Sequence, residues 1–177
     1  MQAEDVVSFW REAGRQKWFK KDAAFDHEFI EKFLDAHEAA LRGKLNSWAD
    51  DARGALALVI LLDQFPRNAF RDSPRMFATD DMAVAVARKS VDAGFDQDTE
   101  EALRAFFYMP FMHSEQLADQ DRCVGLTRPL GEDTLKFAQI HRDIIARFGR
   151  FPHRNKMLGR RAMPGEQEFL DQGGFAG

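Results

Sequence analysis

The sequence contains one stretch that is apolar on every side, Ala55-Leu56-Ala57-Leu58-Val59-Ile60-Leu61-Leu62, which runs directly into Asp63-Gln64-Phe65-Pro66-Arg67-Asn68. A helix that is apolar all round must be enclosed by other elements. The stretch is also far shorter than the roughly 20 residues that a helix needs to cross a bilayer. We therefore expect a central helix inside the core of a soluble protein, with polar residues at its carboxyl end.

Helical periodicity is found on both sides of this central helix. Apolar residues recur at helical spacing over 29–41 and, most clearly, along one face of 132–148. No alternation typical of β-strands appears. The sequence predicts an all-α fold of about seven to eight helices joined by short turns, in a single domain over residues 1–177.

Capping and helix-breaking residues mark the ends of several predicted helices. Asp26 and Thr79 are placed to accept the first N–H groups of two helices. Gly14 and Gly43 are typical of helix ends, and Pro110 predicts the end of another helix.

Composition and charge exclude several classes of protein. The net charge of -4 argues against a general nucleic-acid binder, which needs many uncompensated Lys and Arg residues. The lone Cys123 cannot form an intramolecular disulfide, and the N-terminus lacks the basic region of a secretion signal. We expect a cytoplasmic protein without membrane association.

Asp63 is the first candidate for chemistry. Pro66 predicts that the central helix ends near Phe65, which would place the Asp63 carboxylate at the negative end of the helix dipole. Burial and dipole together would raise the pKa of Asp63 unless a cation compensates. The candidate partners are arginines, namely Arg67, Arg71, Arg150 and Arg154. We favour a buried ion pair that locks the helix end over a catalytic acid.

Two histidines invite different interpretations. His113 precedes Ser114 and Glu115, so His113 and Glu115 could line a cleft as a general base or as metal ligands, or Ser114 could simply cap the next helix. His141 lies on the apolar face of its helix, and a buried imidazole needs hydrogen-bond partners. We interpret His141 as a satisfied core residue.

The segment 147–161 gathers basic residues and His153 around Phe148, Phe151 and Pro152. Such a mixture could bind single-stranded nucleic acid, or a phosphate or carboxylate. Because the whole chain is acidic, we favour intramolecular ion pairs, with one or two arginines left for a small anion.

Motifs for common cofactors and metals are missing from the sequence. There is no glycine-rich phosphate loop, no Gly-x-Ser-x-Gly, no His-Glu-x-x-His and no paired cysteine. We expect neither a cofactor nor a metal ion.

Three long motifs resemble the bacterial DUF924 family, and they span nearly the whole chain in the family's order. They are 61–68 (LLDQFPRN), 108–115 (YMPFMHSE) and 147–155 (RFGRFPHRN). Shorter matches occur at Phe77–Asp80, His141–Asp143 and Leu158–Arg160. The resemblance implies a tetratricopeptide-repeat-like stack of antiparallel helix pairs. It implies no activity, because the family is a domain of unknown function.

Two classes of function remain open. The first is a binding module for a small anion or a peptide in a groove lined by arginine, histidine and carboxylate groups. The second is a small hydrolase that uses His113 or His153 as a base, supported by Asp63 and Glu115. We expect the turns that follow three helices to lie together and form one rim. The predicted site residues are Asp63, Arg67, His113, Glu115, Arg150, His153 and Arg154.

Overall fold

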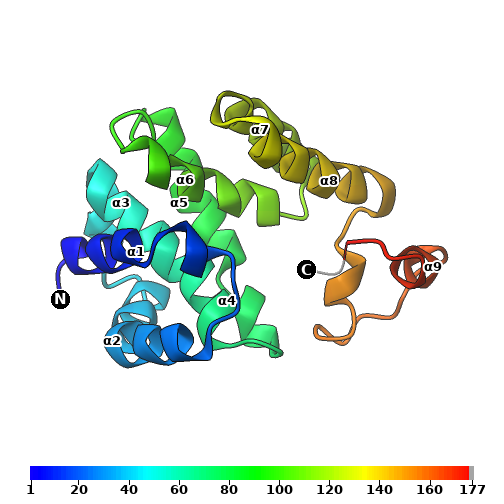
Figure 1. The fold of residues 1–177 in the computed structure, drawn as a ribbon, viewed down its shortest axis with the longest axis horizontal. Helices are drawn as coiled ribbons and strands as arrows, with labels where there is room; N and C mark the ends of the chain where they lie inside the picture. Colours follow the sequence, from blue (N-terminus) through cyan, green and yellow to red (C-terminus); the bar gives the residue numbers. More distant parts are fainter. Residues whose placement is uncertain (176–177) are drawn as a thin grey trace. The chain divides into compact units, whose positions relative to one another are not determined.

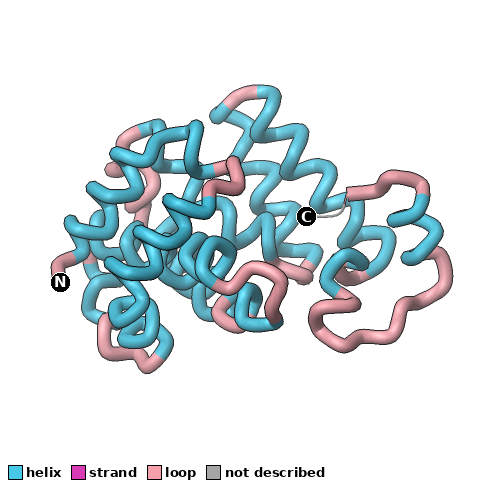
Figure 2. The backbone as a smooth tube through the Cα atoms, turned by 60° about the horizontal axis from the view of Figure 1, so that its bottom comes forward, coloured by secondary structure: helices cyan, strands magenta, loops and turns pink. Residues whose placement is uncertain are grey.

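A computed structural model describes residues 1–175, within which all regular structure is helical and no strand occurs (Figures 1 and 2). The chain divides into two compact units, an N-terminal unit of Met1–Pro110 and a C-terminal unit of Phe111–Gly177. The all-α prediction is confirmed. The single domain and the tetratricopeptide-like stacking stay predictions.

The N-terminal unit contains most of the helices. They are α1 (Ala3–Trp18), α2 (Ala23–Leu41), α3 (Ala52–Val59), α4 (Phe65–Ala69), α5 (Asp80–Asp92) and most of α6 (Glu101–His113), with short helical turns η1 (Asn46–Asp50) and η3 (Pro74–Phe77). A π-helical segment, η2 (Ile60–Gln64), joins α3 to α4 without a break in right-handed helical backbone. When α3, η2 and α4 are taken as one helix, the count over the described residues agrees with the seven to eight predicted.

The α3–η2–α4 helix occupies the centre of the N-terminal unit, as the sequence predicts. Every residue from 54 to 66 is buried. Its α3 part packs against α1 and α5, and α4 packs against α2. Gly54 permits the close approach of η1, since a Cβ there would lie 2.1 Å from the carbonyl oxygen of Trp48. The apolar stretch is therefore enclosed on all sides by other helices.

Aromatic rings fill much of the space around this helix. Trp10 of α1 lies 5.4 Å from Phe29 of α2 and 5.3 Å from Phe106 of α6, measured between ring centroids. Phe29 in turn meets Phe65 edge-on at 5.1 Å. Each of these rings is fully or almost fully buried. Aromatic pairs in such geometry add to the free energy gained by burying their apolar surface.

The helix does not end at Pro66, so this prediction from the sequence is wrong. The N–H of Phe65 bonds to the carbonyl of Ile60, five residues back, which is the π-helical pattern. Pro66 has no N–H to donate, yet the chain continues in helical geometry to Ala69. Two carbonyls that lose their regular helical partners bond to side chains from elsewhere in the unit: His37 Nδ1 of α2 lies 2.9 Å from Leu61 O, and Thr79 Oγ1, just before α5, donates to Leu62 O at 2.5 Å.

Several predicted helix ends also need correction. Asp22, rather than Asp26, caps α2 by accepting from Ala24 and Phe25. Thr79 precedes α5, but its hydroxyl bonds to Leu62 O instead of capping. Pro110 lies inside α6, which continues to His113.

Two glycines behave as the sequence predicts. Gly14 has φ of 67° and breaks the helical geometry of α1, and Gly43 follows α2 with φ of 71°. Positive φ at a helix end favours glycine because it has no Cβ to clash with the backbone.

The C-terminal unit contains α7 (Leu117–Thr127), α8 (Glu132–Phe148) and α9 (Glu166–Asp171), with short turns η4 (Arg128–Leu130) and η5 (Pro152–Arg154). Helices α7 and α8 pack against each other. A small apolar cluster lies at the carboxyl end of α8. It is formed by Ile144, Ile145 and Phe151, against which Ile140, Phe148, Phe169 and Phe175 pack. The charged turns of the third motif are built around this cluster.

Candidate functional site

Asp63 is completely buried and contacts an arginine, as predicted. Its Oδ1 lies 3.3 Å from Arg67 Nη1, and its Oδ2 accepts a hydrogen bond of 2.6 Å from Gln64. Arg67 also donates two hydrogen bonds, of 2.8 and 3.1 Å, to the carboxylate of Asp80. Burial alone would lower the pKa of Arg67, but Asp63 and Asp80 outweigh it and raise that pKa above its usual value.

The position of Asp63 differs from the sequence expectation in one respect. It lies within η2, and α4 continues the helix, so Asp63 is not in a last turn at the negative end of a dipole. Arg71 is occupied elsewhere: it forms hydrogen bonds of 2.7 and 3.0 Å to Asp26. The Asp63 group therefore consists of two carboxylates that share Arg67, held between α4 and the start of α5.

Glu115 of the C-terminal unit joins two of the motif turns. Its carboxylate accepts 2.7 and 3.0 Å hydrogen bonds from Arg160 and a 2.8 Å bond from the N–H of Phe151. Burial favours a higher pKa for Glu115, but the bonds from Arg160 and Phe151 outweigh it, so this pKa falls below its usual value. Glu115 is thus a charged anchor, and its oxygens are engaged within the protein.

Arg150 is engaged in a second closed group, with Glu166 of α9. Glu166 is buried and accepts from Arg150 at 2.6 and 2.8 Å, from Asn155 at 2.8 Å and from the N–H of Met163 at 2.6 Å. These hydrogen bonds, the one from Arg150 first, lower the pKa of Glu166 to about 2. The group ties the segment after α8 to the start of α9.

Arg154 and His113 are brought together through the main-chain carbonyl of His113. Arg154 is buried, donates at 2.9 Å to the carbonyl of His113, and stacks its guanidinium 4.6 Å from the centroid of Phe151. The predicted meeting of the His113–Glu115 turn with the His153–Arg154 turn therefore occurs within the C-terminal unit. The Asp63–Arg67 segment, which is helical and not a turn, belongs to the N-terminal unit, and its membership of the same rim stays a prediction.

His153 and His141 lie in an aromatic environment. His141 Nδ1 lies 2.8 Å from the carbonyl of Phe137, which confirms it as a satisfied, buried residue. The ring of Phe175 lies 4.5 Å from His141 and 5.4 Å from His153. Burial first, then the nearby Arg154 and His141, lower the pKa of His153 to about 4. Within residues 1–175, no group hydrogen-bonds to the buried His153 Nδ1.

Sequence reasoning missed the partners that neutralise these motifs. Asp80, Arg160 and Glu166 are the counter-charges of Arg67, Glu115 and Arg150, yet none was predicted as a site residue. Asp80 and Arg160 do fall in the shorter family matches Phe77–Asp80 and Leu158–Arg160, so these matches could have identified them as site residues. Glu166 stands outside every motif.

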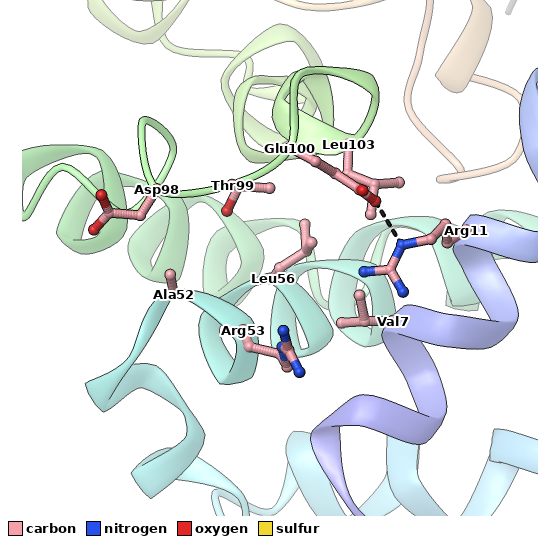
Figure 3. Close-up of a pocket in the computed structure, with 9 residues that line it drawn as sticks. All are labelled: Val7, Arg11, Ala52, Arg53, Leu56, Asp98, Thr99, Glu100 and Leu103. Carbon is pink, nitrogen blue, oxygen red and sulfur yellow. Dashed lines mark hydrogen bonds and ion pairs between the residues drawn. The ribbon is translucent and has the colours of Figure 1, made fainter.

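A pocket of about 320 Å³ lies elsewhere, in the N-terminal unit (Figure 3). Asp98, Thr99 and Glu100 of the connection between α5 and α6 form one side, and residues of α1 and α3 form the other. Its lining consists of Val7, Arg11, Ala52, Arg53, Leu56, Asp98, Thr99, Glu100 and Leu103. No single sequence motif marks these residues, because they come from three segments that are far apart in the sequence.

Comparison with known proteins settles the family but not the activity. A family model described as a bacterial protein of unknown function, DUF924, matches residues 6–174. The chain belongs to the DUF924 family. This confirms the resemblance seen in the three motifs, and the match runs through both units of the DUF924 chain.

A solved structure of a DUF924-like fold is available for comparison. The protein of unknown function ATU0120 from Agrobacterium tumefaciens is similar to this DUF924 chain, with 50% sequence identity and a TM-score of 0.93. The match covers 96% of this chain and 97% of that one. No curated protein matches.

Within residues 1–175, no three His, Cys, Asp or Glu side chains are grouped so that they could hold a metal ion. Over the same residues, no helix combines the length and the apolar character needed to cross a membrane.

Proposed function

We propose that this DUF924 chain is a binding module for a small molecule that carries a carboxylate, held in the pocket between α1, α3 and the α5–α6 connection. The class of function is the one expected from the sequence, a module for a small anion or a peptide end. Its location is different, because the charged motif residues are paired with one another, whereas the pocket retains unused guanidinium donors on Arg11 and Arg53.

The observation that carries the proposal is a pair of arginines with unused donors at the pocket. Arg11 donates Nε to Glu100 at 2.6 Å and has one longer contact of 3.7 Å from Nη1 to Glu4. Arg53 contacts Glu4 through Nη1. A guanidinium has five N–H groups, so Nη2 of both arginines remains available within the described part of the chain. Their side chains are 42% and 62% exposed, and a carboxylate can bind such a fork through two parallel hydrogen bonds.

The floor of the pocket suits the apolar part of a small ligand. Val7, Leu56 and Leu103 line it and are 1–2% exposed, so they form a firm apolar surface below the polar rim. Ligand pockets typically hold about 300–1,000 Å³. The pocket volume of about 320 Å³ lies at the small end of that range, which favours a ligand of a few carbons over a folded partner.

The motif residues support binding less well. A ligand at Arg150 would have to displace the buried Glu166, and a ligand at Arg67 would have to displace Asp63 and Asp80. Breaking such a pair leaves a charge uncompensated, which costs more than an exposed ligand contact returns. We propose a structural role for these groups, as ties between helix ends.

The hydrolase alternative is weaker for a related reason. A general base acts best when its pKa lies near the working pH. The pKa of His153 lies at about 4, and the supporting carboxylates Asp63 and Glu115 are already bound by arginines. A reaction that used these carboxylates would first require their ion pairs with arginine to break.

Isothermal titration calorimetry with 4-methylpentanoate tests the proposal, since this probe has one carboxylate and a branched apolar tail. We expect saturable binding, weakened at least about fivefold by Arg53→Gln because a charge-assisted pair is lost. Arg42→Gln is the matched control: Arg42 is 54% exposed, pairs with one carboxylate, and lies outside the pocket. Equal affinity in the wild type and both variants, or no binding at all, would contradict the proposal.

A further inference from the structure

We infer that the ligand of this pocket is zwitterionic, namely a free α-amino acid with an aliphatic side chain. The inference rests on the proposed function and adds a second recognition element, an acceptor for the ligand's ammonium group. It is carried by the charges of the lining and by one carboxylate that has no partner.

The lining is electrically balanced before any ligand binds. It contains two arginines, Arg11 and Arg53, and two acids, Asp98 and Glu100. Glu4 adds a further carboxylate beside both arginines. A simple anion would therefore bring negative charge to a site that already holds at least as many acids as bases. A ligand that carries its own positive charge avoids this repulsion.

Asp98 is the group placed to receive that positive charge. It is exposed, and no described residue forms a hydrogen bond or an ion pair with its carboxylate. By contrast, Glu100 Oε1 is occupied by Arg11, and the hydroxyl of Thr99 is donated to the carbonyl of Phe95. In Figure 3, Asp98 and Arg11 stand at opposite ends of the lining, with Leu56 between them.

The apolar floor selects the rest of the ligand. A carboxylate on the arginine side and an ammonium towards Asp98 leave the side chain over Val7, Leu56 and Leu103. Burial of methyl and methylene groups there adds favourable free energy in proportion to the area removed from water. An aliphatic amino acid presents all three features in one small molecule.

Three matched probes separate the features: L-leucine, 4-methylpentanoate without the ammonium group, and 3-methylbutan-1-amine without the carboxylate. Calorimetry of the full chain at pH 7 measures each. We expect L-leucine to bind most tightly, by about two- to fivefold over 4-methylpentanoate, because Asp98 is an exposed partner and exposed pairs contribute modestly.

Two variants complete the test. Asp98→Asn should abolish the advantage of L-leucine while leaving the affinity for 4-methylpentanoate unchanged or slightly higher. Asp35→Asn removes the same charge from an exposed position of α2 outside the pocket and should preserve that advantage. Because both aspartates are exposed, melting temperatures without ligand should match the wild type.

The possible failures are distinct. If 4-methylpentanoate binds through Arg53 but L-leucine binds no more tightly, or if Asp98→Asn leaves the preference intact, the zwitterion inference is overturned and the proposed function stands. If Arg53→Gln changes the affinity for no probe, or if no probe binds, both are overturned.

Discussion

Arg67 and Asp80 form two parallel hydrogen bonds, of 2.8 and 3.1 Å, between α4 and the first residue of α5. The same guanidinium lies 3.3 Å from the buried Asp63 carboxylate and donates to the Asp63 carbonyl at 2.9 Å. One cation thus compensates two carboxylates on two helices. The Arg67 side chain is only 14% exposed and makes three hydrogen bonds inside the protein. The motif can therefore be rich in charge without offering an exposed binding surface.

We predict that Asp63→Asn destabilises the protein by roughly 1–3 kcal/mol, because a buried hydrogen-bonded charge is removed while Asp80 still compensates Arg67. The measurement is the free energy of unfolding from urea titration. Asp72→Asn is the control: Asp72 is exposed with φ of 61°, a conformation that asparagine tolerates. An equal loss in both variants would refute a special role for Asp63.

The central helix should be the most sensitive element to loss of volume. Leu58 and Leu61 are 2% and 0% exposed, and replacing either by alanine should cost about 2–5 kcal/mol of unfolding free energy. Leu41→Ala provides the comparison, because that side chain is 40% exposed and should lose much less. Thermal and urea unfolding measure the stability of the central-helix variants and of Leu41→Ala. Near-wild-type stability of Leu58→Ala and Leu61→Ala would place the core elsewhere.

The π-helical segment depends on a hydroxyl from outside the helix. Thr79→Val removes the donor to Leu62 O, and that buried carbonyl has no N–H from Pro66 to replace it. We expect a loss of roughly 1–3 kcal/mol, the cost of an unsatisfied buried acceptor.

Thr127→Val serves as its control. The hydroxyl of Thr127 bonds to Cys123 O inside α7, where that carbonyl is also the acceptor for a regular helical N–H. Urea unfolding should therefore show a smaller loss for Thr127→Val. If the two valine variants lose the same stability, Leu62 O does not depend on Thr79.

Helix existence was predictable because it follows from local periodicity. The apolar run 55–62 and the amphipathic pattern of 132–148 each specify a helix and the face that it buries. The continuation of the helix through Pro66 was not predictable. The proline is tolerated only through the π turn and through hydrogen bonds to the carbonyls of Leu61 and Leu62 from His37 and Thr79, which are distant in sequence. A rule based on neighbouring residues cannot predict hydrogen-bond partners that are brought close only by the tertiary fold.

The candidate site could likewise be predicted from the sequence only in part. Burial of Asp63 beside Arg67 could be predicted, because a carboxylate that directly follows an apolar run needs a nearby cation. The pairing of Glu115 with Arg160 spans 45 residues, and nothing in the spacing specifies it. The pocket at Arg11 and Arg53 was invisible for a further reason: it consists of ordinary surface charges, and only their positions above Val7, Leu56 and Leu103 distinguish them.

Glu166 should make stability depend on pH in the acidic range. Its pKa in the folded protein is about 2, below the usual 4.5, because Arg150, Met163 N–H and Asn155 donate to the carboxylate. A lowered pKa means that the unfolded state binds protons more readily, so the contribution is complete above about pH 5 and is lost as the pH falls towards 2. The pKa difference corresponds to about 3 kcal/mol.

Unfolding free energies at pH 7 and pH 3 test this dependence. Glu166→Gln should be less stable than the wild type at pH 7 and should lose less on acidification, since its amide has no proton to gain. Glu168→Gln, an exposed change in the same helix, should keep the wild-type dependence. If Glu166→Gln loses as much stability between pH 7 and pH 3 as the wild type, then Glu166 is not a source of the acid sensitivity, and the tie from Arg150 to α9 contributes little to folding.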